Sequence, residues 1–337
     1  MISRFIVIAF IALSFGLFAA PASSGETNIN IGFQPGTSPR FFVAKNEKMF
    51  EKVGLAPNYV KFTTGPTMLA ALRSKDIDVG YMTTPPVIFG LSQGLDLKVF
   101  FIESDSAETQ ALVAVPNGAI KSFADQQGRK IGVTFGSSAH YGLLKSLQQA
   151  NLAADSVTIL DMQPGTILPA FIRNDIDGAW CWDPWTAKME SENGSLIGSV
   201  GSMHLPMPGV WIARAEWLSS EEAKVQQFIK AMDLTSELLV TDQKGAIAGI
   251  AEQLGVDEAV ATRIFDRIER PSLTTQIRGY GYEAALGTTQ TKASAGMSVH
   301  MNDVAEFFFS RKQIPVKPDV IAAIEPGPLE RYLAAKK

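Results

Sequence analysis

Short runs of alternating polar and apolar positions, separated by helix-like patterns, fill most of the first half of the chain. Residues 28–33 (NINIGF) alternate and stop at the turn-rich QPGTSP, which predicts a strand followed by a loop. Residues 57–62, 77–82 and 97–104 predict further strands, with helical patterns between them. Strands that alternate with helices indicate βαβ units and a mostly parallel sheet.

The same succession starts again at Glu108, so the pattern predicts two α/β blocks. Strands are expected at 130–135, 157–162, 177–182 and 195–201, and residues 206–214 (PMPGVWIAR) form a connecting strand. Because a helix-rich tail packs more readily on an existing sheet than alone, we expect it to return to the first block, with the chain crossing near 104–112 and 206–213. The helices of that tail are predicted at 220–241, 243–254, 257–267, 296–311 and 318–334.

The N-terminus has the pattern of an export signal. Arg4 precedes an apolar run over residues 5–20, and Ala20-Pro21-Ala22 is the small-x-small pattern of a signal-peptidase site. The alternative is a membrane anchor, but the run is short for a bilayer span of roughly 20 residues and has no basic stop. We therefore expect residues 1–22 to be removed and the mature protein to be soluble in a periplasm.

Composition excludes several classes of function. The 337 residues carry a formal charge of −4 without a cluster of Lys and Arg, which argues against a nucleic-acid partner. Cys181 is the only cysteine, so no intrachain disulfide and no lipidated N-terminal cysteine are expected. The three histidines have no metal-ligand spacing, and the common catalytic and cofactor motifs are absent, so we expect no metal and no cofactor.

Polar or aromatic residues follow four of the predicted strands. In open α/β sheets, ligands bind where the carboxyl ends of strands meet loops and helix starts. The four segments are QPGTSP with Gln34, MTTPP with Thr83 and Thr84, GSSAHY, and WCWDPW.

GSSAHY predicts a helix start that suits an anion. Ser137 or Ser138 is a typical N-cap, and the free N–H groups of a first helical turn attract anionic oxygens. The alternative is an ordinary capped helix without a ligand. His140 near the first turn either donates to the anion or is a surface residue.

WCWDPW offers groups for a cation. Trp182 could pack against a cationic or apolar group and Asp183 could accept an ammonium, but Asp183-Pro184 is equally typical of a helix cap. Trp211 on the connecting strand is another aromatic candidate, and any of the tryptophans could instead lie in the core.

These segments resemble the taurine and alkanesulfonate group of periplasmic solute-binding proteins. The resemblance spans nearly all of the mature chain, and SSAHYGLLKSL (residues 137–147) and SLTTQ (residues 272–276) are similar to the taurine-binding branch. It is most specific at four segments: MLAALRSKDIDVGYMTTPP, ADQQGRKIGVTFGSSAHYGLLKSL, IRNDIDGAWCWDPW and GVWIAR.

The resemblance implies a two-lobed type II periplasmic binding protein fold. The first lobe would hold residues 23–107 and 212–337, and the second would hold residues 108–211. It implies a monomeric solute-binding component of an ABC importer, with a membrane permease as its partner and no chemistry of its own. The sulfonate would fall on Ser137, Ser138 and His140, with Gln34 and Thr83 or Thr84 reaching across from the other lobe. The ammonium end would meet Trp182, Asp183 and Trp211.

Two kinds of alternative stay open. The same fold could bind nitrate, a thiamine-pyrimidine precursor or a carboxylate zwitterion. Relatives of the fold also include a desulfinase with a cleft cysteine, which would require Cys181 to lie near His140 or Arg173 with a low pKa.

Overall fold

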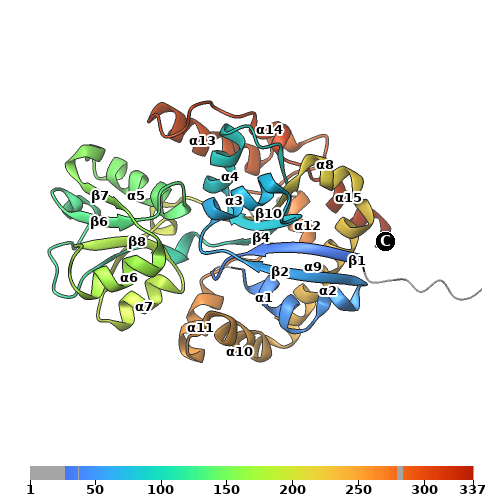
Figure 1. Ribbon diagram of the computed structural model, residues 1–337, viewed down its shortest axis with the longest axis horizontal. Helices are drawn as coiled ribbons and strands as arrows, with labels where there is room; N and C mark the ends of the chain where they lie inside the picture. The colour runs from blue at the N-terminus through green and yellow to red at the C-terminus, as the bar shows by residue number, and fades with distance from the viewer. Residues whose placement is uncertain (1–26, 37, 279–283, 337) are drawn as a thin grey trace, which may run out of the picture.

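The computed structural model describes residues 27–36, 38–278 and 284–336, and it contains two five-stranded sheets that lie side by side (Figure 1). The predicted signal segment 1–22 is outside the described residues. We use "first lobe" for the sheet that contains the N-terminal strand together with its helices, and "second lobe" for the other sheet with its helices.

The first sheet has the order β2-β1-β3-β10-β4. Strand β1 pairs in parallel with β2 and β3, whereas β10 runs antiparallel between β3 and β4. The bounds are β1 Thr27–Phe33, β2 Leu55–Lys61, β3 Val79–Thr83, β4 Leu97–Asp105 and β10 Pro208–Arg214.

The second sheet has the order β7-β6-β8-β5-β9. Strand β6 pairs in parallel with β7 and β8, and β5 runs antiparallel to β8 and β9. The bounds are β5 Gln110–Ala114, β6 Lys130–Val133, β7 Thr158–Asp161, β8 Gly178–Trp182 and β9 Ser195–Ser199.

The expectation of a mostly parallel sheet is wrong, because each sheet has as many antiparallel as parallel pairings. The antiparallel strands are β5 and β10. Each is the first strand that the chain forms after it passes from one sheet to the other. A strand that arrives without a crossover helix in its own sheet is not restricted to the parallel direction.

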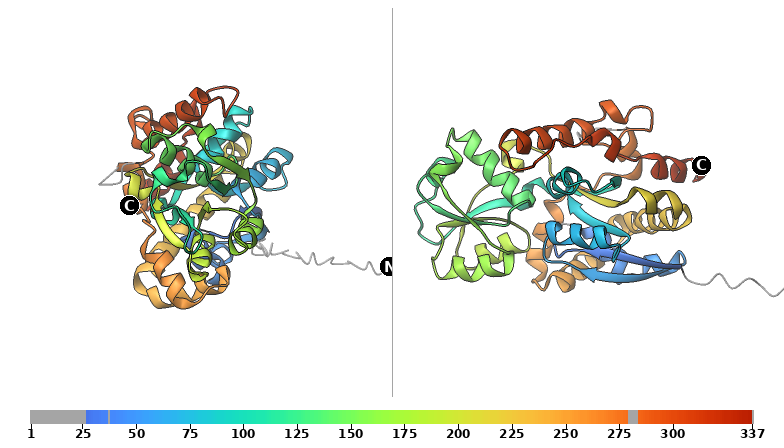
Figure 2. Two further views of the ribbon diagram at one scale, coloured as in Figure 1. Left: turned by 90° about the vertical axis from the view of Figure 1, so that its left-hand side faces the viewer. Right: turned by 45° about the horizontal axis from the view of Figure 1, so that its top comes forward.

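The helices cover both sheets, and after β10 the named elements of the described chain are all helical. The tail packs on the first lobe, where α9 contacts α1 and α2, and α13 contacts α4 (Figures 1 and 2). The α-helices are α1 Pro39–Asn46, α2 Met49–Lys52, α3 Gly65–Ser74, α4 Thr84–Ser92, α5 Ser138–Gln149, α6 Pro164–Ile172, α7 Trp185–Ser191, α8 Ala215–Ser220, α9 Glu222–Thr241, α10 Gln243–Leu254, α11 Glu258–Asp266, α12 Leu273–Arg278, α13 Gly296–Ser310, α14 Val320–Ala323 and α15 Gly327–Ala335. Short 3₁₀ turns are η1 Ala107–Thr109, η2 Phe123–Gln126, η3 Ala154–Ser156, η4 Gly201–Met203 and η5 Lys292–Ser294.

The chain passes between the sheets twice, at 106–109 and at 200–207. The first passage lies inside the predicted 104–112. The second comes earlier than the predicted 206–213, because β10 pairs with the first sheet from Pro208 onward. The lobe division at 107/108 and 211/212 stays a prediction, and its second boundary falls within β10.

Aromatic side chains fill the centre of the first lobe. The Trp211 ring centroid lies 5.2 Å from that of Phe41 and 5.0 Å from that of Phe228, and all three side chains are fully buried. Burial of each such side chain contributes about 2–3 kcal/mol to folding. This cluster holds α1 and α9 against β10.

Among the described residues, no helix combines the length and the apolar character needed to cross a membrane.

Candidate functional site

The loop after β1 lies against the carboxyl end of β8, which brings the two lobes together. A side-chain carbon placed on Gly36 would lie 3.4 Å from Cδ1 of Trp182 and 3.6 Å from the carbonyl oxygen of Asp183. The segments QPGTSP and WCWDPW therefore face one another, as expected for strand ends that share a ligand site.

Four buried polar atoms of these two segments have no hydrogen-bond partner in the described part of the chain. The first lobe contributes Oε1 of Gln34 and Oγ of Ser38, and the second contributes Nε1 of Trp182 and Oδ2 of Asp183. Buried polar groups are nearly always hydrogen-bonded, because leaving one without a partner costs about 1–3 kcal/mol. Donors and acceptors that gather unpaired from two lobes are what a small polar ligand would satisfy.

Asp183 has one carboxylate oxygen bonded to helix α7 and one without a partner among the described residues. Its Oδ1 accepts hydrogen bonds from the Thr186 hydroxyl and, at 3.2 Å, from the Ala187 N–H, so it holds the first turn of α7, whose N-cap residue is Pro184 and not the predicted Asp183. Its Oδ2 is one of the unpaired atoms. Burial raises the pKa of this carboxyl group, and Arg263, with Nη2 3.9 Å from Oδ1, opposes that rise.

Helix α5 begins as predicted, with Ser137 as its N-cap. The Ser137 hydroxyl accepts from the His140 N–H at 3.2 Å and donates to the Thr134 carbonyl at 2.6 Å. Ser138 donates its hydroxyl proton to Oε1 of Gln110 at 2.7 Å. Because both hydroxyl protons are used within the second lobe, α5 would attract an anion chiefly through its first-turn N–H groups and its dipole.

His140 is buried, so the alternative of a surface histidine is wrong. Its Nδ1 accepts a long hydrogen bond of 3.4 Å from the Gly136 N–H, which assigns the proton to Nε2. The ring stacks on Phe135, with 4.6 Å between the centroids. Burial lowers the pKa of His140 to about 4, so the imidazole is a neutral donor at pH 7.

Thr83 and Thr84 end β3 and begin α4. Thr83 is buried at the N-cap position of that helix. The Thr84 hydroxyl hydrogen-bonds Nε2 of His300 at 2.7 Å, which joins α4 to α13 within the first lobe. The Thr84 hydroxyl is thus already hydrogen-bonded, whereas the Thr83 hydroxyl makes no hydrogen bond among the described residues.

Trp211 does not join the other candidates. Its indole N–H donates to Oε2 of Glu103 at 3.1 Å, and its ring belongs to the buried aromatic cluster of the first lobe. Trp211 is therefore a core tryptophan, as the alternative interpretation expected, and the proposed site does not include it.

Cys181 has the environment of an inert thiol. It is fully buried on β8, and burial raises the pKa of the thiol to about 12. A thiol is nucleophilic only as its thiolate, which this environment disfavours. No group of His, Cys, Asp and Glu side chains among the described residues has the arrangement of a metal site.

Two residues of the site have no role in the sequence-based prediction. Ser38 was included only as part of the loop segment QPGTSP, although Ser-Pro before an apolar run is a recognisable helix start. Arg263 lies 80 residues beyond Asp183 on an amphipathic helix, α11. No local pattern distinguishes it from an ordinary surface arginine.

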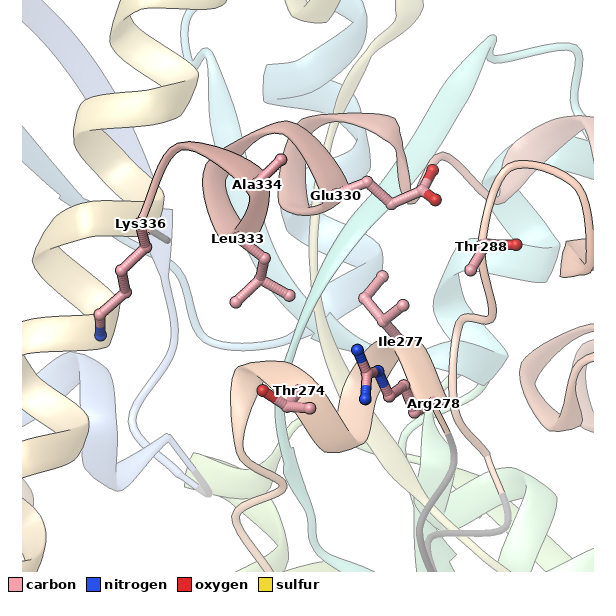
Figure 3. A pocket seen from close by; sticks show the side chains of 8 residues that line it. All are labelled: Thr274, Ile277, Arg278, Thr288, Glu330, Leu333, Ala334 and Lys336. Carbon is pink, nitrogen blue, oxygen red and sulfur yellow. The ribbon is translucent and has the colours of Figure 1, made fainter.

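The SLTTQ motif makes its hydrogen bonds within the first lobe. Gln276 accepts the Ile102 N–H at 2.8 Å and so ties α12 to β4. A hollow of about 410 Å³ lies between α12 and α15, bordered by Ile277, Arg278 and Glu330 among others (Figure 3). The motif thus has a structural role in the first lobe.

Comparison with known proteins gives consistent results. The model of the family described as NMT1/THI5 like matches residues 38–246, which is more than half of the chain. The taurine-binding periplasmic protein of Escherichia coli (strain K12) is 27% identical over 312 residues, which cover 89% of this chain and 96% of that protein. A putative aliphatic sulfonates-binding protein of Bacillus subtilis (strain 168) is 30% identical over 236 residues, 68% of this chain and 71% of that protein.

Solved structures give the same fold. The alkanesulfonate-binding protein SsuA from Xanthomonas axonopodis pv. citri bound to MOPS matches with a TM-score of 0.75 at 22% identity, over 89% of this chain and 99% of that chain. The predicted two-lobed α/β fold is thereby confirmed, and so is the predicted similarity to taurine-binding and sulfonate-binding proteins.

Proposed function

We propose that this chain, which belongs to the NMT1/THI5 like family, is the periplasmic solute-binding component of an ABC importer and captures taurine or a related small sulfonate between its lobes. The observation that carries the proposal is the gathering of Gln34, Ser38, Trp182 and Asp183, whose buried polar atoms lack partners in the described chain.

The sulfonate end belongs, in this proposal, at the start of α5. Three partly negative oxygens suit the positive end of the helix dipole and its free N–H groups. Nε2–H of His140 adds a neutral donor. The Thr83 hydroxyl and the Nε2 protons of Gln34, both buried in the first lobe, would donate to the sulfonate oxygens as well. The hydroxyl oxygens of Ser137 and Ser138 position this turn through their own hydrogen bonds.

The ammonium end belongs at Asp183 and Trp182. An ammonium supplies donors for the unpaired Oδ2, and its charge favours the ionised form of a carboxyl group whose pKa burial raises. The Trp182 ring face offers a cation–π contact. A ligand with both charges would thus meet complementary groups at its two ends.

Transport requires no bond chemistry from this chain. The two passages at 106–109 and 200–207 join the lobes, and a ligand that contacts both lobes favours the closed form. In this proposal residues 1–22 direct export to the periplasm, the mature protein is a monomer, and its closed form presents the ligand to a membrane permease.

Thermal unfolding of residues 23–337 with different solutes tests the proposal. A ligand at 100 times its Kd stabilises by about 2.7 kcal/mol, which raises the midpoint by several degrees. We expect the largest rise with taurine, and smaller rises with ethanesulfonate, which lacks the ammonium, and with β-alanine, which lacks the sulfonate. No rise with any sulfonate, but a rise with nitrate or a thiamine-pyrimidine precursor, would replace this ligand class by another.

An enzyme on the same scaffold is the second candidate, and the surroundings of Cys181 oppose it. A desulfinase would need a reactive thiol, whereas this one is fully buried with a raised pKa. Titration of the native protein with a thiol reagent should leave Cys181 unmodified until the protein unfolds. Rapid modification at neutral pH would favour the enzyme.

A further inference from the structure

Helix α11 reaches from the first lobe to the second. It packs on α10, which packs on α1 and α9, and α10 and α11 lie along the lower edge of the first lobe in Figure 1. From α11, Nη2 of Arg263 lies 2.7 Å from Oε2 of Glu190 on α7. It also lies 3.9 Å from Oδ1 of Asp183.

A second arginine follows one helical turn later. Arg267 donates to the carbonyl oxygen of Glu108, in the first passage between the lobes. Residues four apart share a face of a helix, so both guanidinium groups leave the same side of α11, one toward the second lobe and one toward the passage between the lobes. Two side chains from one face of α11 therefore contribute to the contact of this helix with the second lobe and the passage.

The Arg263 contact differs from an ordinary surface ion pair. The exposed side-chain fraction is 36% for Arg263 but 20% for Glu190 and 0% for Asp183, so both carboxylates are shielded from water. An exposed pair contributes little because water and salt screen it, whereas partly buried pairs are screened much less. The guanidinium joins elements of both lobes, so opening the cleft would separate it from Glu190.

We propose that Arg263 is a positioning residue that holds the lobes closed around the ligand without touching it. The inference rests on the proposed function, since it presupposes that the lobes open and close on a solute. The contact forms as the lobes close, so it should slow reopening and hardly affect the initial encounter. Because the contact between Arg263 and Glu190 favours the closed state whichever solute is bound, its loss in E190Q should change the affinity for every ligand by the same factor. R263Q also removes a charge that lowers the pKa of Asp183, so it should affect taurine at least as much as ethanesulfonate.

Rapid-mixing measurements of association and dissociation test this on the mature protein with taurine and with ethanesulfonate. For R263Q we expect dissociation of both ligands to accelerate by roughly fivefold to tenfold, with association within about twofold of wild type. R263K should restore part of the slow dissociation. E190Q should resemble R263Q, and the double variant should lose less than the sum of the two.

The control is R173Q, which removes an exposed arginine paired with Asp175 only two residues away. It should leave both rates unchanged. The thermal midpoint of each ligand-free variant reports folding separately, and E190Q carries the test if R263Q does not fold.

Unchanged dissociation in both R263Q and E190Q would overturn the inference while leaving the proposed function intact. Loss of taurine binding with ethanesulfonate unaffected would overturn it too, because that result assigns Arg263 to the ammonium end. If the wild-type protein bound neither ligand, the proposed function would fail and the inference with it.

Discussion

At the scale of single residues, the unpaired Oδ2 of Asp183 makes the sharpest distinction between ligands. D183N keeps the shape and the acceptor for the first turn of α7 but removes the charge. A hydrogen bond to a charged group contributes about 1.5–3 kcal/mol, so we expect taurine affinity to fall roughly tenfold to hundredfold. Calorimetric titration should show ethanesulfonate affinity nearly unchanged. Equal losses for both ligands would assign Asp183 to the fold alone.

His140 and His300 predict how stability depends on pH. Burial lowers the pKa of each to about 4, below the ordinary value of 6.5. Above pH 6.5 both are neutral in folded and unfolded chains and contribute nothing to the pH dependence. Between pH 6.5 and about 4 only the unfolded chain takes up these protons, so unfolding becomes easier as the pH falls.

Urea unfolding at pH 7.5, 6.5 and 5 measures this loss. Each histidine can contribute a loss on the order of 3 kcal/mol across the window. H300Q, which keeps a polar group near Thr84, should show a shallower fall than wild type, although it is less stable at pH 7.5. A fall of the same steepness in H300Q would contradict the assignment of this proton uptake to His300.

At the scale of elements, two buried side chains of opposite charge, Arg40 and Glu103, join α1 to β4, to β10 and to the C-terminal tail. Arg40 donates to the carbonyl oxygens of Ile102 at 3.0 Å and Pro271 at 3.1 Å. Glu103 accepts from the Phe41 N–H at 3.0 Å and from the Trp211 indole at 3.1 Å. Burial raises the pKa of Glu103 and lowers that of Arg40, and each charge opposes the shift of the other.

Removing one member of this pair should be strongly destabilising. R40M leaves the carbonyl oxygens of Ile102 and Pro271 without their buried donor and removes the positive charge that opposes the raised pKa of Glu103. Since a hydrogen bond to a charged group contributes about 1.5–3 kcal/mol, we expect a loss on the order of 3 kcal/mol. Chemical unfolding should show that loss, and the double variant R40M/E103Q should lose less than the two single variants added together. Additive losses would mean that the charges do not interact.

The elements were more predictable than their pairing. Period-2 and helical patterns located β1, α5 and α13 within a few residues, because local sequence decides those patterns. The antiparallel direction of β5 and β10 depends on contacts between segments far apart in the sequence, which periodicity does not record. The break between α14 and α15 at Pro326 was missed in the predicted helix 318–334.

For the candidate site too, the sequence predicted some residues correctly in position and could not predict others. The strand-end rule led to Gln34, Trp182 and Asp183, which lie at the contact between the lobes. The rule does not say which face of a strand meets the ligand, and Trp211 points into the aromatic core. Arg263 could not be predicted because its role depends on how the tail folds back across the lobes.

At the scale of the whole molecule, closure requires the loop after β1 to approach β8. Gly36 has no side chain, and a Cβ there would already lie 3.4 Å from Trp182. G36L should therefore act as a wedge that keeps the lobes apart while leaving each lobe folded. We expect it to abolish the thermal shift with taurine and the decrease in radius of gyration that small-angle scattering should show for the wild type.

Gly165 offers a matched control for this wedge. A Cβ at Gly165 would meet nothing within 4 Å, so G165L adds the same bulk on the second lobe where no described atom lies close to it. The control should show the same thermal shift with taurine and the same decrease in radius of gyration as the wild type. If G36L also bound taurine and compacted, closure would not depend on this contact, and the ligand would have to be held elsewhere than between Gln34 and Asp183.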